Sequence, residues 1–286
     1  MDSRSKHIRR ALLLAITTIW ILSQNARAQS ADQAWLKYAP IHASSSIPSN
    51  VLPLGDSPLE QSAAQELKRG LAGLLSESPA HNSSVIAIGT VNEIRAAYPQ
   101  IAIPDVPDPE GFVLTQARKN NRIDWVIAGG RDRGALYGAF ALLRILSESQ
   151  KLPGSAVRST PAMPIRWVDE WDNADGSIER GYAGRSIFFE GGKVRDDLKP
   201  VEEYARLLAS VGINGCNVNN VNADLDALSS EHLREFARAS QIVEWGSRAL
   251  AFHPLGIGAG REALAAPAEH DDANSRIFAE RPEHSS

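Results

Sequence analysis

A dense cluster of polar and aromatic side chains lies between residues 169 and 189 of this 286-residue chain. Trp171 offers a flat apolar face of the kind that packs against the C–H face of a sugar ring. Glu170, Asp172 and Asn173 flank it and can hold hydroxyl groups through hydrogen bonds, of which those to the carboxylates are charge-assisted. Three arginines nearby could bond both oxygens of a carboxylate through their planar fork: Arg166, Arg180 and Arg185. These residue types favour a site for an acidic carbohydrate.

An irregular surface loop is the alternative interpretation of the same residues. Surface loops are polar in most proteins, and the charges of this one could pair among themselves while Trp171 caps the core. Composition alone does not decide between the two interpretations, so the surrounding elements have to be considered.

Strands and a helix around the cluster predict where its side chains lie. Residues 165–168 have the pattern of a short buried strand that leads directly into the cluster. A helix predicted at 200–211 follows, and then a strand at 216–218 that ends in Asn219 and Asn220. Strand, helix and strand in this order predict a parallel βα unit, and in a (β/α) barrel the functional residues follow the C-terminal ends of the strands. We therefore expect the cluster and the two asparagines on one rim.

The part of the chain before this unit predicts a small α/β domain with a partly antiparallel sheet. Ser57-Pro58-Leu59-Glu60 is a capping box with proline at the first helical position, which predicts that a helix begins there. Its apolar residues recur at helical spacing, so one face packs on a sheet. The other predicted elements are strands at 85–88, 111–115 and 124–128, the last two joined by a turn at 117–121, and a helix from near Asp132.

A glycine-rich segment at 129–134 lies between the last of these strands and the last helix, where a phosphate-binding loop would lie. It lacks the Lys-Ser/Thr of a P-loop and the G-x-G-x-x-G spacing of a dinucleotide site. A tight turn from strand to helix is therefore favoured over phosphate binding.

Bulk composition excludes several other classes of function. The formal net charge of -4 and the pI of about 6.0 give no basic surface for nucleic acid. The single cysteine, Cys216, lies in an apolar run and can form neither a disulfide framework nor a thiolate metal site. The seven histidines are scattered without metal-ligand spacing. We predict no metal, no cofactor and no nucleic-acid partner, and the sequence is compatible with a homodimer without fixing the oligomeric state.

The N-terminal residues have the pattern of a secretory signal. A basic start is followed by an apolar run from Ala11 to Leu22 and by Ala26-Arg27-Ala28. A membrane anchor is the alternative, but a run of about a dozen residues is shorter than the roughly 20 that span a bilayer. We predict export, to the periplasm or outside the cell, with cleavage after Ala28, and no contact with the membrane afterwards.

Changes in composition predict the domain organisation. Leu152-Pro153-Gly154-Ser155 has linker composition, and Pro161 and Pro164 precede the next element. The predicted parts are a signal peptide at 1–28, the small α/β domain at 29–152, a linker at 153–163, the first βα units of a barrel at 164–260, and a disordered tail at 261–286.

An ordered series of motifs resembles the α-glucuronidases of glycoside hydrolase family 67. The series comprises residues 171–173, 175–184, 186–189, 204–215 and 218–223. Residues 133–143 also resemble the last helix of the small α/β domain that precedes the barrel in hexosaminidases and α-glucuronidases. The resemblance implies a hexosaminidase-like N-terminal domain followed by the start of a TIM (β/α) barrel.

The same resemblance implies a function in xylan degradation. The expected reaction removes terminal 4-O-methyl-D-glucuronic acid from xylo-oligosaccharides with inversion at the anomeric carbon. Inversion requires one carboxylic acid that protonates the leaving oxygen and one carboxylate that activates water. By resemblance, Trp171 is the sugar platform, and the other expected substrate contacts are Glu170, Asp172, Asn173, Arg180, Asn219 and Asn220.

The chain departs from the family pattern after these motifs. A complete barrel takes about 250 residues, and far fewer remain from Ile165 to Ser286. A helix from near Ser230 and a third strand within 248–253 are predicted, but the tail loses the βα rhythm. No catalytic acid or base can be named, and Asp175 and Glu179 are expected to shape the loop. The alternative to a truncated enzyme is an inactive exported remnant that binds carbohydrate.

Overall fold

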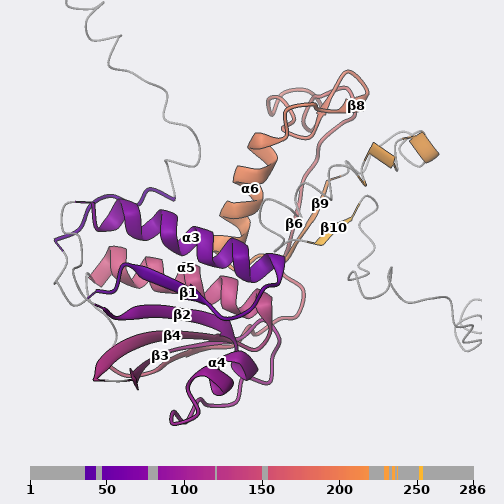
Figure 1. Cartoon of the computed structure of the whole chain (residues 1–286). Coiled ribbons are helices and arrows are strands. Elements are labelled where there is room, and N and C mark those ends of the chain that lie inside the picture. The colour runs from indigo at the N-terminus through magenta and orange to yellow at the C-terminus, as the bar shows by residue number, and fades with distance from the viewer. Residues whose placement is uncertain are drawn as a thin grey trace, which may run out of the picture.

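The structure, a computed structural model, consists of two units that meet along one side (Figure 1). It describes residues 36–42, 47–76, 83–119, 121–149, 154–218, 229–231, 234–235, 237 and 251–253. The first unit is a mixed α/β layer structure, and the second contains short parallel strands and one long helix. The predicted α/β class is therefore confirmed at this level.

The first unit is built on a five-stranded mixed sheet with the order β1-β2-β4-β3-β5. The first three of these strands in the spatial order are parallel, whereas β3 is antiparallel to both of its neighbours. The β3–β4 pair is the predicted hairpin, although both strands extend further towards the turn than the sequence indicates. The strands are β1 (Asn50–Pro53), β2 (Val85–Thr90), β3 (Phe112–Lys119), β4 (Arg122–Gly129) and β5 (Val157–Ser159).

Helices cover both faces of this sheet. The helices α3 (Pro58–Leu74) and α5 (Asp132–Ser149) pack on one face, and α4 (Val91–Ala97) packs on the other (Figure 1). Successive residues of a strand point to opposite faces, so Ile86 belongs to the core under α3 and α5, whereas Ala87 belongs to the core under α4.

Capping boxes begin the two helices that follow β1 and β2. The predicted box at α3 is present, because the Glu60 backbone N–H donates to Ser57 Oγ over 3.2 Å and the Ser57 N–H donates to Glu60 Oε2 over 3.1 Å. An equivalent box formed by Thr90 and Glu93 begins α4, a helix that the sequence analysis did not predict.

The glycine-rich segment at 129–134 is a close-packed turn. A Cβ at Gly130 would collide with the carbonyl oxygen of Asp108, and a Cβ at Gly134 would collide with that of Gly111. The backbone N–H of Gly130 donates to the carbonyl of Gly111 over 2.8 Å. Glycine is therefore required here for contact with the preceding loop, which supports the interpretation as a tight turn.

The second unit contains a three-stranded parallel sheet with the order β10-β9-β6. Its strands are β6 (Trp167–Asp169), β9 (Gly215–Asn217) and β10 (Ala251–His253), and a short hairpin of β7 (Phe189–Glu190) and β8 (Lys193–Val194) lies between β6 and the helix α6 (Lys199–Ser210). The predicted strand, helix and strand are all present. A separate apolar core lies under α6, and it includes Phe188, Val201 and Cys216.

The segment between the units is partly structured. Residues 157–159, which lie within the predicted linker, form β5 and pair with β3 at the edge of the first sheet. The predicted domain limits themselves stay predictions. The predicted signal at 1–28 and the predicted tail at 261–286 lie outside the described residues.

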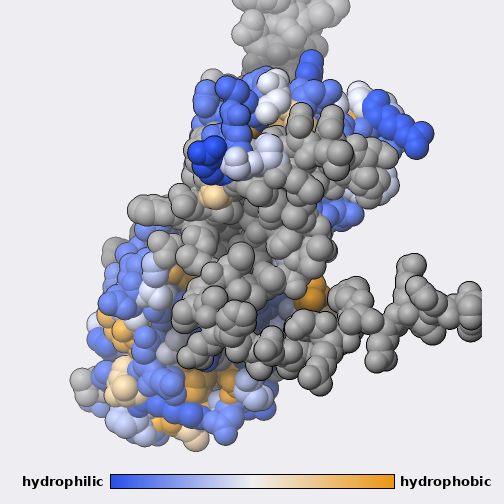
Figure 2. All heavy atoms as spheres, turned by 90° about the vertical axis from the view of Figure 1, so that its right-hand side faces the viewer, coloured by the Kyte–Doolittle hydropathy of each residue, from blue (hydrophilic) through white to orange (hydrophobic). Residues whose placement is uncertain are grey.

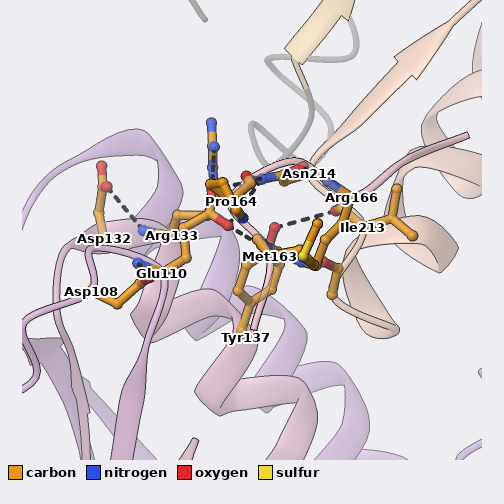
Figure 3. A network of polar contacts seen from close by, with 11 residues as sticks. Asp108, Glu110, Asp132, Arg133, Tyr137, Met163, Pro164, Arg166, Ile213 and Asn214 are labelled. Atoms are coloured by element: carbon orange, nitrogen blue, oxygen red, sulfur yellow. Dashed lines mark hydrogen bonds and ion pairs between the residues drawn. The ribbon is translucent and has the colours of Figure 1, made fainter. Parts of the chain in front are cut away.

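A network of charged and polar groups joins the two units (Figure 3). Glu110 of the first unit pairs through Oε1 with Arg133 of α5 over 2.6 Å and through Oε2 with Arg166, just before β6. Asn214, just before β9, donates from Nδ2 to both carboxylate oxygens over 3.2 and 3.1 Å. Tyr137 of α5 donates to the carbonyl of Ile213 over 3.2 Å. One carboxylate is therefore shared between groups of both units.

The network also fixes the two strands relative to each other. Arg166 N–H donates to Asn214 Oδ1 over 2.9 Å, and Asn214 N–H donates to the Arg166 carbonyl over 2.9 Å. Burial alone would raise the pKa of Glu110, but the hydrogen bonds from Arg133 and Arg166 overcome it and hold this pKa below its ordinary value. Glu110 therefore stays ionised, and the stability that it contributes is present above the ordinary glutamate pKa and is lost as the pH falls below it.

Replacement of Glu110 by alanine should destabilise the fold by about 2–4 kcal/mol, because Arg133 and Arg166 would be left without their shared partner in a mostly buried position. Urea unfolding of the variant at neutral pH measures this loss. Asp105→Asn is the matched control, because Asp105 pairs with Arg95 at the surface and should leave the midpoint unchanged. Equal midpoints for Glu110→Ala and Asp105→Asn would contradict the role of Glu110.

Candidate functional site

The polar cluster begins where β6 ends. Asp169 is paired with Asn217 across the β6–β9 ladder, and Asn217 Nδ2 donates to Asp169 Oδ1 over 2.6 Å. The backbone N–H of Glu170 extends the pairing by donating to the Asn217 carbonyl over 2.8 Å. The cluster and the end of β9 therefore lie side by side, at the C-terminal ends of two parallel strands. We call residues 169–173 together with Asn217 the rim.

Tyr204 of α6 orients the Glu170 side chain. Its hydroxyl donates to Glu170 Oε1, and its ring stands edge-on to Phe188 with centroids 6.4 Å apart. Burial and the hydrogen bond to the Glu170 carboxylate raise the pKa of Tyr204, so the phenol remains a donor at any physiological pH. The half-buried Glu170 carboxylate thus has one oxygen fixed by Tyr204, and its other oxygen can accept a hydrogen bond from a ligand.

Trp171 is held through a hydrogen bond at one edge of its ring and is partly exposed to solvent. Its indole Nε1 donates to Asp169 Oδ2 over 3.2 Å, and its carbonyl accepts from the Glu179 N–H over 2.8 Å. The residue is 40% exposed, and Tyr182 of the same loop is 76% exposed. An aromatic ring with a fixed edge and an accessible surface is what a sugar platform requires.

Asp172 is a buried residue of the rim and is only 3% exposed. Within the described part of the chain, its buried Oδ1 atom has no hydrogen-bond partner. Burial raises the pKa of Asp172, a hydrogen bond from Ser186 opposes the rise, and the charge of Glu170 adds to it. Asp172 therefore favours the neutral form more than an ordinary aspartate, and it contacts the interior of the loop.

Asn173 and its neighbours shape the loop. The Asn173 amide donates to Ser177 Oγ over 2.9 Å and to the Glu179 carbonyl over 2.7 Å. Asp175 Oδ1 accepts from the Ser177 N–H and hydroxyl over 2.8 and 2.6 Å, and these bonds lower the pKa of Asp175. Glu179 has a φ of 57°, in the left-handed region. Asp175 and Glu179 thus take the loop-shaping role expected of them.

The three candidate arginines have different environments. Arg166 lies at the opposite end of β6, where it pairs with Glu110 and donates to the Gly212 carbonyl over 2.6 Å, so the expectation that it is available to an acidic ligand is wrong (Figure 3). Arg180 has 81% of its side chain exposed and lies 3.9 Å from Glu179. Arg185 is also exposed. Exposed arginines of this loop are therefore the cations that a carboxylate could reach.

The rim is rich in hydrogen-bond acceptors. Among the described residues, Asp169 and Glu170 form no salt bridge, whereas the unpartnered side-chain oxygens of Asn217 and Asp172 are buried. The accessible carboxylates of Asp169 and Glu170 suit the hydroxyl groups of a sugar. No group of three or more His, Cys, Asp or Glu side chains that could hold a metal occurs in the described ranges. Burial raises the pKa of the Cys216 thiol, in keeping with a packing role.

The expected site and the observed site differ in their residues. Asn219 and Asn220 lie outside the described residues, so their place on the rim stays a prediction. Tyr204 and Asn217 were not among the expected site residues. Tyr204 has the spacing of an apolar helix position, and nothing in the local sequence indicates a partner 34 residues earlier.

A largely hydrophilic surface covers the end of the second unit, at the top of Figure 2. The exposed side chains of the 170–197 loop and of α6 include many charged groups. Trp171 and Tyr182 are therefore large aromatic side chains exposed within polar surroundings. Such a setting is typical of a site that binds a polar ligand with one apolar face.

Two family models match this chain. The model described as "Glycosyl hydrolase family 67 N-terminus" matches residues 34–142, and the "Glycosyl hydrolase family 67 middle domain" matches residues 145–251. Together they account for nearly all of the two units described above.

Curated relatives agree with the family models. Probable alpha-glucuronidase A of Aspergillus niger is 39% identical over 242 residues, which cover 80% of this chain and 28% of the relative. Alpha-glucuronidase A of Aspergillus tubingensis is 39% identical over 244 residues, which cover 81% of this chain and 28% of the relative. This chain therefore spans less than a third of the length of these relatives.

Among solved structures, a family GH115 4-O-methyl-α-glucuronidase superposes with a TM-score of 0.45 at 18% identity, covering 70% of this chain and 28% of that chain. A superposition of this quality supports no inference about the site.

Replacement of Tyr204 by phenylalanine should lower the free energy of unfolding by about 1–2 kcal/mol, because Glu170 would lose its buried donor. Chemical denaturation at neutral pH measures the change. Tyr182→Phe is the matched control, since Tyr182 is exposed on the same loop and its hydroxyl should not affect stability. The assigned Tyr204–Glu170 bond would be contradicted by a Tyr204→Phe variant as stable as the Tyr182→Phe variant.

Proposed function

This chain belongs to glycosyl hydrolase family 67, and we propose that it is the substrate-holding front part of an α-glucuronidase that acts on glucuronoxylan-derived oligosaccharides. The proposed reaction of the enzyme is removal of terminal 4-O-methyl-D-glucuronic acid from xylo-oligosaccharides. The observation that carries the proposal is that both family models match consecutive parts of the chain, and the second includes the whole rim.

The proposed architecture is a hexosaminidase-like α/β domain followed by the first βα units of a TIM barrel. Three features support it: β6, β9 and β10 are parallel, they neighbour each other in sequence order, and α6 connects the first two. Successive parallel strands joined by helices are how a (β/α) barrel begins. In such a barrel, the rim lies on the face where the active site is built.

In the proposed complex, the sugar ring packs on Trp171, and its hydroxyls donate to Glu170. Trp171 supports this role because its surface is exposed while its edge is fixed, and Glu170 supports it because Tyr204 engages only one of its oxygens. Arg180 is proposed to approach the uronic carboxylate from the exposed loop. Asn219 and Asn220 are proposed as further contacts from the end of β9.

Asp172 and Asn173 are proposed to help sugar binding indirectly, by shaping the loop that carries Trp171. Asp172 is buried, and both hydrogen bonds that the Asn173 amide donates go to loop atoms. Their contribution is then to fix the backbone that carries Trp171. A rigid loop lowers the entropy that is lost when the sugar binds.

The chain is proposed to supply binding and orientation, not the acid and base of an inverting reaction. By family resemblance, those carboxylates lie on later barrel strands, and an inverting pair must be separated widely enough to admit water. The second candidate is an inactive protein that binds the sugar without cleaving it. It is favoured by the environments of the rim carboxylates, because Glu170 is bonded to Tyr204 and Asp172 is buried.

Export remains part of the proposal. The predicted signal at 1–28, with cleavage after Ala28, is the basis for a periplasmic or extracellular location. Among the described residues, none of the helices combines the length and apolar character needed to cross a membrane.

Trp171→Ala should weaken binding of D-glucuronic acid about tenfold, because the loss of an aromatic platform costs on the order of 1.4 kcal/mol. Titration of the purified chain followed by NMR measures the affinity. Trp171→Phe should retain much of it, since an aromatic face remains. Met163→Ala is the control, because Met163 is exposed near the other end of β6. Undiminished affinity in Trp171→Ala would contradict the platform.

Incubation of the purified chain with an aldouronic acid tests whether these residues bind the sugar without cleaving it. Release of 4-O-methyl-D-glucuronic acid by these 286 residues would show that they contain an acid and a base and would contradict the assignment of binding alone. We expect binding without release. Absence of both binding and release from a well-folded chain would contradict the sugar-holding rim itself.

A further inference from the structure

Two carboxyl groups meet at an edge of the first sheet, away from the rim. Glu60 and Glu93 are the third residues of α3 and α4, and each completes the capping box of its helix. Because β1 and β2 are adjacent parallel strands, both chains leave the sheet at the same edge, and the two helices begin there on opposite faces. Glu60 packs beside Gly55 and Glu93 beside Gly89, and the Leu54 N–H donates to the Ile88 carbonyl over 2.9 Å between these two strand ends. The two carboxyl groups therefore lie close together at this edge.

Each carboxyl group has one oxygen engaged by its own capping box. Glu60 Oε2 accepts from the Ser57 N–H over 3.1 Å. Glu93 Oε2 accepts from the Thr90 N–H over 2.7 Å and from the Thr90 hydroxyl over 2.9 Å. Glu60 Oε1 is buried and has no hydrogen-bond partner among the described residues. A hydrogen bond between two carboxyl groups requires a proton on one of them.

Among the described residues, no cation compensates the charges that the two groups would carry if both ionised. Glu60 is 2% exposed, and Gly55 leaves no space beside it, because a Cβ there would collide with its carboxyl group. Neither carboxyl forms a salt bridge with a lysine or arginine of the described residues. The nearest arginine along α4, Arg95, pairs with Asp105, and Asp56 before α3 is exposed. Two like charges in this position would repel each other without compensation.

We propose that Glu60 and Glu93 form a proton-binding site that holds a single proton between two carboxyl groups and fastens the starts of α3 and α4 to each other. Glu60 Oε1 carries the proton and donates it to the Glu93 carboxylate. No function of the rim is involved, so the site stands whether or not the chain binds sugar.

Proton binding here makes stability depend on pH. Burial, followed by the hydrogen bond with Glu93, raises the pKa of Glu60 to about 7, whereas hydrogen bonds from Glu60 and Thr90 overcome the effect of burial on Glu93 and lower its pKa. An unfolded chain releases the Glu60 proton near the ordinary pKa of about 4.3. Between about 4.3 and 7 the folded chain therefore binds more protons, and its stability falls as the pH rises through this range. Ionised Glu93 also contributes to stability, and this contribution is lost as the pH falls below about 4.3.

Glu60→Gln tests the site, because the amide imitates the protonated carboxyl group. Its N–H donates to the Glu93 carboxylate, and its carbonyl accepts from the Ser57 N–H at every pH. Between pH 5 and 7, the folding equilibrium constant of the natural chain should fall as the pH rises. The fall should be steeper than that of Glu60→Gln by up to about tenfold per pH unit. Urea unfolding at several pH values measures both. Glu202→Gln, at the exposed first turn of α6, should keep the pH dependence of the natural chain.

Two further measurements decide the outcome if Glu60→Gln folds poorly. Glu93→Gln also places an amide donor opposite a carboxylate, so it should likewise reduce the pH dependence. The natural chain at pH 6 should show an infrared carbonyl band of a protonated carboxylic acid that Glu60→Gln lacks. An unchanged pH dependence in both variants would overturn the proposal. So would a divalent cation that raises the midpoint of the natural chain at pH 8 but not that of either variant, since the pair would then be a metal site.

Discussion

The Glu110 carboxylate binds groups from both units at once, and the geometry of the second unit depends on it. Arg133 comes from the helix of the first unit, whereas Arg166 and Asn214 immediately precede β6 and β9. These strands are only three residues long, so their own ladder supplies few hydrogen bonds to fix their direction. The shared carboxylate and the reciprocal bonds between Arg166 and Asn214 fix the N-terminal ends of both strands. A charge with this many donors is costly to disturb.

Because β6 and β9 are short, fixing their N-terminal ends also fixes the position of their C-terminal ends, where the rim lies. From Arg166 the chain needs only the three residues of β6 to reach Glu170, so the Arg166 anchor and the Glu170 carboxylate lie at opposite ends of one short strand. Tyr204 then connects the rim to α6, and the core under α6 holds Phe188 against the tyrosine ring. The Trp171 surface is thus supported by a series of buried contacts that begins in the first unit. Rigid support of this kind is what a carbohydrate platform needs.

Local patterns predicted the elements whose causes are local. The Ser57–Glu60 box, the hairpin and the helix from Asp132 all depend on neighbouring residues. The same kind of local pattern, Thr90 followed three residues later by Glu93, begins α4. Local patterns could not predict β5 or the roles of Arg166 and Tyr204, because their partners lie dozens of residues away. β5 pairs with β3, Arg166 with Glu110, and Tyr204 with Glu170. Arg166 shows the consequence, since its closeness in sequence to the cluster suggested a ligand contact that the fold does not permit.

Glu110, Arg166 and Asn214 hold the rim in place from the opposite ends of β6 and β9. Hydrogen–deuterium exchange of the natural chain and of Asn214→Ala, analysed peptide by peptide, tests this dependence. Asn214→Ala should exchange faster at 166–173 and 215–218, including the Glu170 amide, with unchanged protection of β2 and β4 in the first sheet. Rim amides that keep their protection while Asn214 is replaced would contradict it.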